Sequence, residues 1–254
     1  MKRQNLYLST VDPQAHLLAG QHGLGLEFAE FCTAWNLDDE FPATDAAVRR
    51  KMTCTDRFTI HGPFNELHPC AIDRRARELA RFRFLQTIET AADYGIRKIV
   101  LHGGYLPRVY FPVWYTEQSA LFWKDLLRDI PEEMTICVEN VLEDTPEMIA
   151  DIIRQVADPR LRMTLDVGHA HVYSRVPAAE WIRRCADVID HYHIHNNDGA
   201  RDDHQSLFQG TIPMEPLFDL VSTLTPQATV TLELPEAAPS IRWLRDKNIL
   251  EDFL

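Results

Sequence analysis

Histidine and carboxylate side chains recur at one kind of position in this chain, near the end of a short apolar run. Six of them follow six successive runs, namely His61, His102, Glu139, Asp166, His193 and Glu233. Three more stand close by in sequence, namely His169, Asp202 and His204. Imidazole and carboxylate together suit Zn or Mn, with Fe or Co as further options, whereas an oxygen-only set would favour Mg or Ca. We therefore expect a divalent metal site, and nine candidate ligands are enough for two or three ions per chain.

These residues can meet only if the runs that carry them are neighbouring strands. Short β-branched runs alternate with longer amphipathic segments along the chain, which is typical of repeated βα units. The expected strands cover 6–8, 24–28, 58–61, 98–102, 135–139, 162–166, 191–195 and 229–234. In a parallel barrel all strand ends open onto one face. We predict the α/β class, as a single (β/α)8 TIM barrel with its active site at the C-terminal ends of the strands.

The segments between the strands predict helices and a loop at the mouth of the barrel. Helices are expected over 13–21, 29–35, 73–94, 117–129, 146–156, 178–185, 214–222 and 240–247, with Asp73 and Thr145 as N-caps of two of them. The segment 105–115 is rich in aromatic residues and proline and is expected to be a loop. Tyr105, Arg108 and Trp114 in this segment are candidate substrate contacts. Further candidates are Asn140, Asn196 and Arg201.

Bulk properties favour one globular domain over residues 1–254. The chain has 254 residues, is 45% hydrophobic and 25% charged, and has a formal net charge of -12. This charge disfavours a nucleic-acid partner, although metal cations could reverse the local sign. Neither a membrane span nor an apolar secretory signal is recognisable, so we expect a soluble cytoplasmic protein without a membrane partner. Its five scattered cysteines contain no C-x-x-C pair and are expected to be reduced.

At the candidate ligands the sequence resembles the xylose-isomerase-like TIM barrel superfamily, over essentially the whole chain. This group contains sugar-phosphate isomerases and epimerases and the endonuclease IV group, also called AP endonuclease family 2. For the isomerases the resemblance implies four ligands, which are Glu139, Asp166, His193 and Glu233. For the endonuclease IV group it implies a three-metal cluster, with the additions His61 in His-Gly-Pro, His102 in His-Gly-Gly, His169 in Asp-x-x-His, and Asp202 with His204 in Asp-x-His.

The chain departs from the endonuclease pattern in two respects. The segment 193–199, His-Ile-His-Asn-Asn-Asp-Gly, looks more like an uncharacterised sugar-isomerase-like branch than the His-Leu-Asn-Asp-Ser run of the endonucleases. No basic loop suited to gripping DNA accompanies the ligands. These departures argue against a role in DNA repair.

Three functions are compatible with these residues. We favour a multimetal phosphoester hydrolase of a sugar-phosphate-type substrate, in which Glu139 and Glu233 orient a water, because it uses all nine ligands. The alternative is a single-metal sugar or sugar-phosphate isomerase or epimerase, in which the same two carboxylates carry protons. The third is a sugar- or metal-binding barrel without catalysis.

The remaining histidines are expected to be structural or surface residues, with His171 and His195 nearest the pocket. They are His16, His22, His68, His171, His191 and His195. Because residues two apart share one face of a strand, the pattern leaves open whether His193 or His195 is the ligand of the seventh strand. The sequence carries no signal for an oligomeric state.

Overall fold

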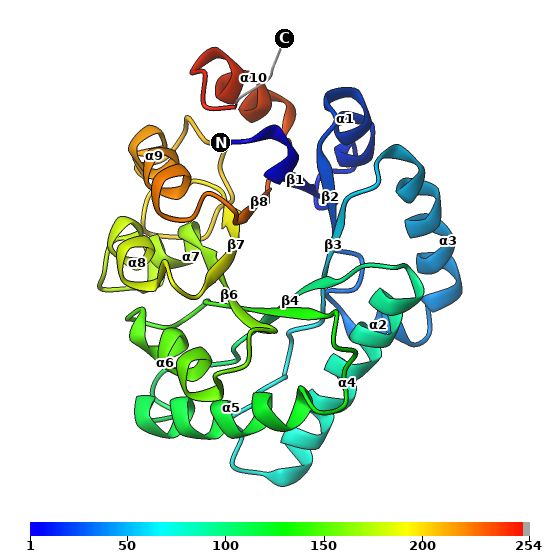
Figure 1. The fold of residues 1–254 in the computed structure, drawn as a ribbon, viewed down its shortest axis with the longest axis vertical. Coiled ribbons are helices and arrows are strands. Elements are labelled where there is room, and N and C mark those ends of the chain that lie inside the picture. The colour runs from blue at the N-terminus through cyan, green and yellow to red at the C-terminus, as the bar shows by residue number, and fades with distance from the viewer. Residues whose placement is uncertain (251–254) are drawn as a thin grey trace.

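Eight parallel strands close into a barrel, each paired with the next along the chain and the last with the first (Figure 1). The computed structural model describes residues 1–250. The strands are β1 (Leu6–Ser9), β2 (Gly25–Phe28), β3 (Phe58–His61), β4 (Lys98–His102), β5 (Thr135–Glu139), β6 (Leu161–Asp166), β7 (Ile189–Ile194) and β8 (Thr229–Leu232). The predicted (β/α)8 TIM barrel is therefore confirmed.

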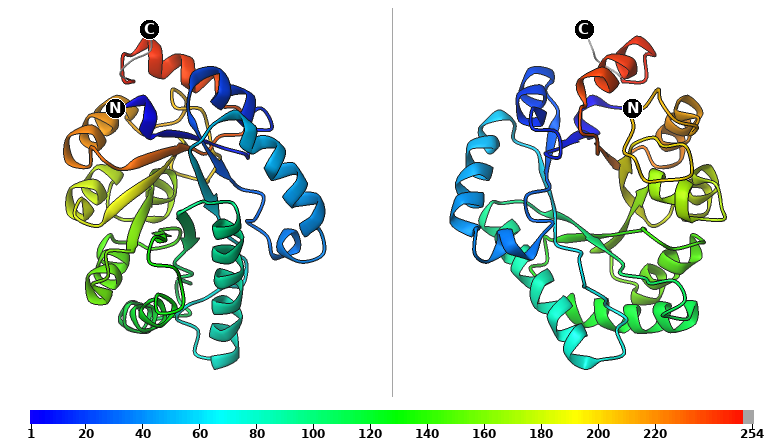
Figure 2. Two further views of the ribbon diagram at one scale, coloured as in Figure 1. Left: turned by 45° about the vertical axis from the view of Figure 1, so that its right-hand side comes forward. Right: turned by 180° about the vertical axis from the view of Figure 1, so that it is seen from behind.

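Helices form an outer ring around the strands (Figure 2). They are α1 (Ala15–His22), α2 (Ala34–Leu37), α3 (Phe41–Lys51), α4 (Arg74–Asp93), α5 (Pro112–Leu126), α6 (Glu147–Val156), α7 (Val167–Tyr173), α8 (Ala178–Cys185), α9 (Met214–Leu224) and α10 (Ala238–Asp246), with short 3-10 turns at Arg3–Asn5 and Met52–Cys54. In α6, Ile149, Ile152 and Ile153 are buried at helical spacing, and each such side chain contributes about 1.5–3 kcal/mol by leaving water. None of the helices within residues 1–250 has the length and apolar character needed to cross a membrane.

Two helices were not expected from the sequence. In α3 only Thr44 and Val48 are buried, so its apolar stripe is too sparse to be recognised. Helix α7 has seven residues, too few to show a period, and begins directly at the end of β6. The side chain of Asp166 caps it by accepting a hydrogen bond of 2.7 Å from the backbone N–H of His169. This cap fixes the direction in which His169 leaves the strand.

Other helix boundaries differ from those expected from the sequence. The expected loop over 105–115 is shorter, because α5 begins at Pro112 and includes Trp114 and Tyr115. The expected cap at Asp73 is confirmed, since its side chain accepts from the N–H of Arg75. The expected cap at Thr145 is wrong, because α6 is preceded by Pro146 and has no side-chain cap. The helix expected over 29–35 is the four-residue α2 instead.

The last two strands end earlier than expected. Strand β7 begins at Ile189 and ends at Ile194, with a bulge opposite Met163 and Thr164. His195 therefore lies just beyond β7, and Glu233 lies one residue beyond β8. Both residues still follow strand ends, so both lie at the mouth of the barrel.

Candidate metal centre

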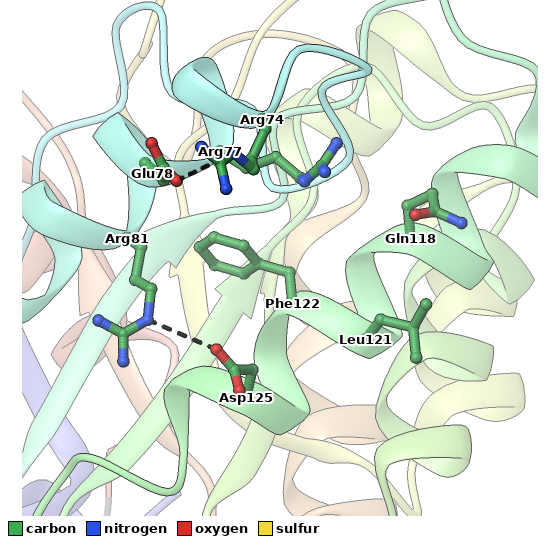
Figure 3. Close-up of a pocket in the computed structure, with 8 residues that line it drawn as sticks. All are labelled: Arg74, Arg77, Glu78, Arg81, Gln118, Leu121, Phe122 and Asp125. Carbon is green, nitrogen blue, oxygen red and sulfur yellow. Dashed lines mark ion pairs between the residues drawn. The ribbon is translucent and has the colours of Figure 1, made fainter.

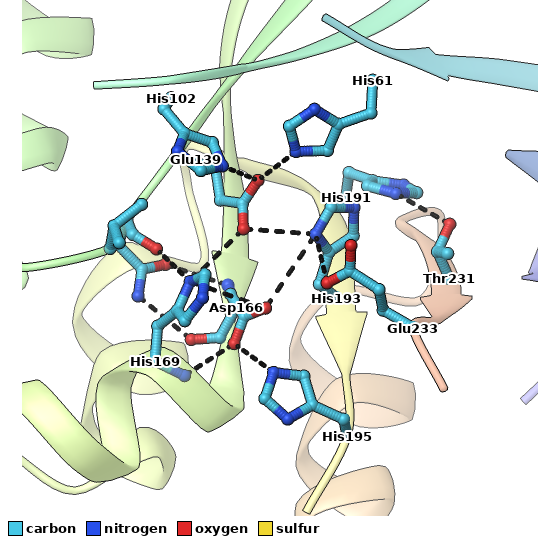
Figure 4. A network of polar contacts seen from close by, with 12 residues as sticks. His61, His102, Glu139, Asp166, His169, His191, His193, His195, Thr231 and Glu233 are labelled. Carbon is cyan, nitrogen blue, oxygen red and sulfur yellow. Dashed lines mark hydrogen bonds and ion pairs between the residues drawn. The ribbon is translucent and has the colours of Figure 1, made fainter. Parts of the chain in front are cut away.

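Glu139, the last residue of β5, is the hub of a cluster of histidines at the mouth of the barrel (Figure 4). It is 1% exposed. Its carboxylate oxygens lie 3.1 Å from His61 Nε2, 3.2 Å from His193 Nδ1, and 3.4 Å from both His102 Nε2 and His169 Nδ1. Four imidazoles thus surround one buried carboxylate. Such an arrangement is stabilised when the imidazoles are protonated or when a cation binds between them and the carboxylate.

A second carboxylate, Asp202, gathers a further set of histidines on the loop after β7. Its oxygens lie 3.2 Å from His169 Nε2, 3.2 Å from His204 Nε2 and 3.5 Å from His195 Nε2. The rings of His195 and His204 stack, with centroids 3.8 Å apart. His195 also lies 3.2 Å from Asp166 Oδ1. His195, expected to be one of the histidines nearest the pocket, thus lies among the candidate ligands.

His193 and Glu233 link the two sets. His193 Nδ1 lies 3.6 Å from Glu233 Oε2 and 3.9 Å from Asp166 Oδ2, besides its contact with Glu139. Glu233 also lies 3.8 Å from His204 Nδ1. All nine residues that the sequence singled out as ligands thus belong to one connected cluster. Both His193 and His195 reach this cluster.

Three of the histidines are held with one ring nitrogen turned into the cluster. The Nδ1–H groups of His61, His169 and His204 donate to the backbone carbonyls of Gly62, Asn140 and Glu233, at 2.8, 2.9 and 2.9 Å. A carbonyl can only accept, so Nδ1 carries a proton, and Nε2 is left to bind a cation or, when protonated, to donate to a carboxylate. This is the arrangement that orients imidazole ligands in metal sites.

Several buried polar atoms of the cluster have no hydrogen-bond partner within residues 1–250. They are Asp166 Oδ2, Asp202 Oδ1 and both ring nitrogens of His193 and His195. Each such atom costs about 1–3 kcal/mol when nothing compensates its lost hydration. A coordinated cation would compensate these atoms directly. The mixed nitrogen and oxygen donor set fits Zn, Mn, Fe or Co.

Ligand atoms gather in groups small enough for individual ions. The atoms within each group lie within 4.8 Å of one another, and the groups at the mouth are His61, Glu139 and His193; Glu139, Asp166 and His169; Asp166, His195 and Glu233; and His169, His195, Asp202 and His204. The first and last groups share no residue. Together they offer seven ligands, one more than an octahedral ion accepts.

The charges of the cluster shift the pKa values of its members. Burial alone would raise the pKa of Glu139, but His193, His102 and His169 together outweigh it and hold that pKa well below its usual range. Burial would lower the pKa of His204, but Asp202 and neighbouring acidic groups raise it to about 9. The pKa of His169 is shifted well upward in the same way. In the metal-free protein these imidazoles therefore hold protons that a metal ion must displace.

Glu27 was missed from the sequence. It lies in β2, is 0% exposed, and its Oε2 accepts hydrogen bonds from Thr59 and Thr231 and meets His191 Nε2 at 3.0 Å. These partners lie on β3, β8 and β7, so the contacts run across the barrel interior. A carboxylate inside the apolar run 24–28 was the available signal. His191, expected to be structural, is held here between Glu27 and Thr229.

Two of the candidate substrate contacts form hydrogen bonds with the protein backbone, and two others are exposed. Asn140 pairs with the backbone of Asp166 through both its amide oxygen and nitrogen, at 2.9 and 3.0 Å. Asn196 likewise bonds the backbone of its own loop. These two amides therefore hold the backbone at the site, and their contact with a substrate stays a prediction. Arg108 and Arg201 are exposed on the loops after β4 and β7.

Of the aromatic candidates, Tyr105 is buried and Trp114 is 36% exposed. Tyr105 is 9% exposed and lies against Tyr115, with ring centroids 5.0 Å apart. The indole of Trp114 donates to the carbonyl of Cys70 at 2.9 Å. Phe64, which was not predicted, stacks instead on His102 with centroids 4.4 Å apart and an interplanar angle of 13°. An apolar wall therefore stands directly beside a candidate ligand.

A groove of about 310 Å³ lies elsewhere, on the outer wall between α4 and α5 (Figure 3). Four of its charged groups are paired with one another, Arg74 with Glu78 at 3.3 Å and Arg81 with Asp125 at 3.6 Å. Within the described part of the chain, every close group of three metal-ligating side chains lies inside the barrel and none lies here. The chemistry-bearing residues thus point to the mouth rather than to this groove.

Comparison with known proteins agrees with this architecture. The model of a family described as xylose isomerase-like TIM barrel matches residues 22–247. An uncharacterized protein of Methanocaldococcus jannaschii is 24% identical over 227 residues, covering 82% of this chain and 74% of its own.

Solved structures show the same fold over nearly the whole chain. A D-tagatose 3-epimerase-like protein has a TM-score of 0.79 and 20% identity over 96% of both chains. A Thermus thermophilus protein soaked with ZnCl2 has a TM-score of 0.75 and 24% identity, over 96% of this chain and 97% of its own.

Proposed function

Because the chain belongs to the xylose isomerase-like TIM barrel family, we propose that it is a metal-dependent enzyme, and that it hydrolyses phosphoesters with two or three divalent ions. The observation that carries this proposal is the pair of ligand groups that share no residue, one around Glu139 and one around Asp202. A single ion would leave one group unused. Zinc in the crystals of one structural neighbour supports Zn as the first metal to test.

The ligand groups suggest how the ions would be held. One ion fits His61, Glu139 and His193, and a second fits His169, His195, Asp202 and His204, while Asp166 and Glu233 lie between them. Ions held there would supply a nucleophile at neutral pH and would stabilise charge on phosphoryl oxygens.

The chain's own groups would then move protons and bind the substrate. The side chain of Glu233 is 12% exposed, more open than that of Glu139 at 1%, so Glu233 is better placed to take a proton from an attacking water. Arg108 and Arg201 stand on loops at the mouth, where their guanidinium groups would bind an anionic part of the substrate.

One observation favours a second function, the epimerisation of a ketose or its phosphate. His193 Nδ1 lies within 3.9 Å of three carboxylates, those of Glu139, Asp166 and Glu233, which is a complete ligand set for one ion. In that reaction Glu139 and Glu233 would remove and return a proton beside the carbonyl. The epimerase-like neighbour agrees with this alternative.

Assays on the metal-loaded protein distinguish the two functions. We expect phosphate or alcohol release from a panel of sugar phosphates and other phosphoesters, including abasic DNA. Hydrogen exchange at carbon in D2O with ketoses and ketose phosphates would instead support epimerisation and contradict hydrolysis.

His61 provides the matched variant for these assays. His61 lies outside the single-ion ligand set, which is formed by Glu139, Asp166, His193 and Glu233. His61→Ala should therefore lower hydrolysis at least about 100-fold, because the stabilisation of transition-state charge by a metal ion is worth several kcal/mol. Hydrolysis that persists unchanged in this variant would contradict a role for the first ligand group.

A further inference from the structure

A buried carboxylate lies one level below the candidate ligands, inside the barrel. Glu27 is paired in register with Thr59, which stands two residues before His61, and its nearest histidines are His191 and His193. His193 Nε2 lies 2.8 Å from Glu27 Oε1, although the ring is turned away from ideal hydrogen-bond alignment. The side chains of both residues are at most 1% exposed.

The two oxygens of Glu27 have different surroundings. Oε2 is surrounded by Thr59 Oγ1 at 2.8 Å, His191 Nε2 at 3.0 Å and Thr231 Oγ1 at 3.1 Å. Oε1 has no hydrogen-bond partner among residues 1–250, and His193 Nε2 is its close neighbour. Because Oε2 is occupied by these three partners, Oε1 is the oxygen that faces His193.

His193 differs from the other oriented histidines in what stands behind it. His61, His169 and His204 each donate from one ring nitrogen to a backbone carbonyl, which has no net charge. Behind His193 stands a full carboxylate. The nitrogen on its other side, Nδ1, faces Glu139 and Glu233.

We propose that Glu27 is a positioning residue that holds the His193 ring with Nδ1 aimed into the metal centre. This inference rests on the proposed metal-dependent function. A carboxylate behind an imidazole fixes its orientation and makes its ligating nitrogen more basic, and removing such a group typically weakens metal binding 10- to 100-fold. Thr59, Thr231 and His191 in turn hold the carboxylate in place.

The test compares the metal affinity of three proteins by chelator competition, with Co²⁺ as the probe. Glu27→Gln keeps the size of the side chain but removes its charge, and we expect affinity to fall at least about tenfold. Thr59→Val is the matched control, since it removes one donor to Oε2 and leaves His193 untouched, and we expect a loss below about threefold. The visible absorption of bound Co²⁺ should change in Glu27→Gln and stay as in the wild type in Thr59→Val.

The outcomes separate this inference from the proposed function. Wild-type affinity in Glu27→Gln, or equal losses in both variants, would overturn the positioning role while leaving the metal centre intact. A wild-type protein that binds no Co²⁺ or Zn²⁺ would overturn both. Circular dichroism of each variant shows that the fold is retained before the affinities are compared.

Discussion

At the floor of the barrel, Lys98 donates hydrogen bonds to the carbonyl of Asp190 and to Thr229 Oγ1, at 3.0 and 2.9 Å, and pairs with the Asp190 carboxylate at 2.7 Å. At the mouth, by contrast, Asp166, His193 and other ligands leave buried atoms without hydrogen-bond partners in the described chain. Both ends bury charge. A polar group that completes its own contacts stabilises the fold, whereas one left open is available to a ligand.

Barrel interiors are usually filled by layers of branched apolar side chains. Here the middle of the barrel contains Glu27, Thr59, His191 and Thr231 instead, joined by hydrogen bonds. This network connects the closed floor to the open mouth. The following predictions test the difference between the two ends, from the largest expected effect to the smallest.

Substitution at the hub of the mouth should have the largest effect. Glu139→Gln removes the carboxylate that four histidines approach, so we expect metal content to fall and activity to drop at least about 100-fold. Elemental analysis and turnover measured on the same preparation check this. Full metal content with normal turnover would show that Glu139 is not a ligand.

Substitutions in the two separate ligand groups should each remove part of the metal. His61→Ala and His204→Ala each alter one group and leave the other complete. We expect each variant to lose about one ion per chain, because each substitution removes a ligand from a group of only three or four. Loss of all metal from either single variant would indicate one shared site instead of two.

A substitution at the floor of the barrel should lower the free energy of unfolding and leave metal affinity unchanged. Lys98→Met leaves Asp190 without its partner. Because the carboxylate is one-third exposed, we expect a loss of about 2 kcal/mol in the free energy of unfolding, below the range for fully buried pairs. Metal affinity should stay within about threefold of the wild type. Urea denaturation and chelator competition measure the two quantities, and a large loss of affinity would mean that the two ends are coupled.

Metal binding should release protons from the mouth. Acidic neighbours, acting against burial, raise the pKa of His204 to about 9 and that of His169 well above its usual range, so both are protonated at pH 7 in the metal-free protein. Metal ions bind neutral imidazole, and affinity should therefore rise with pH up to about 9. Calorimetry in buffers of different ionisation enthalpy counts the protons, and a count of zero would contradict the assignment.

The smallest effect should come from the exposed rim. Arg108→Ala should raise KM about threefold to tenfold for a phosphorylated substrate and leave KM for a neutral analogue unchanged, because an exposed guanidinium contributes about 1 kcal/mol to binding an anion. Equal changes for both substrates would indicate a packing effect.

The fold was largely predictable because strands buried on both faces leave a strong apolar signal. The bounds of β3, β4 and β5 and of α8 agree with the expected ranges. The missed helices α3 and α7 have too few buried apolar residues or too little length to show a period.

The site was predictable only in outline. Ligands at strand ends could be listed, because a parallel barrel brings such ends to one face. The choice between His193 and His195 stayed open in the sequence because the turn after β7 and the stacking of His195 on His204 are set by tertiary contacts. Glu27 was missed because its role depends on partners on β3, β7 and β8, which only the closed barrel brings together.

The most direct test of the account is the number of metal ions bound per folded chain, measured by elemental analysis of protein purified without chelators or an affinity metal. We predict two or three ions of Zn, Mn or Fe per chain. A content of one ion would contradict the multimetal hydrolase and favour the epimerase, and a metal-free protein that takes up no added Zn²⁺ or Mn²⁺ would contradict the metal centre itself.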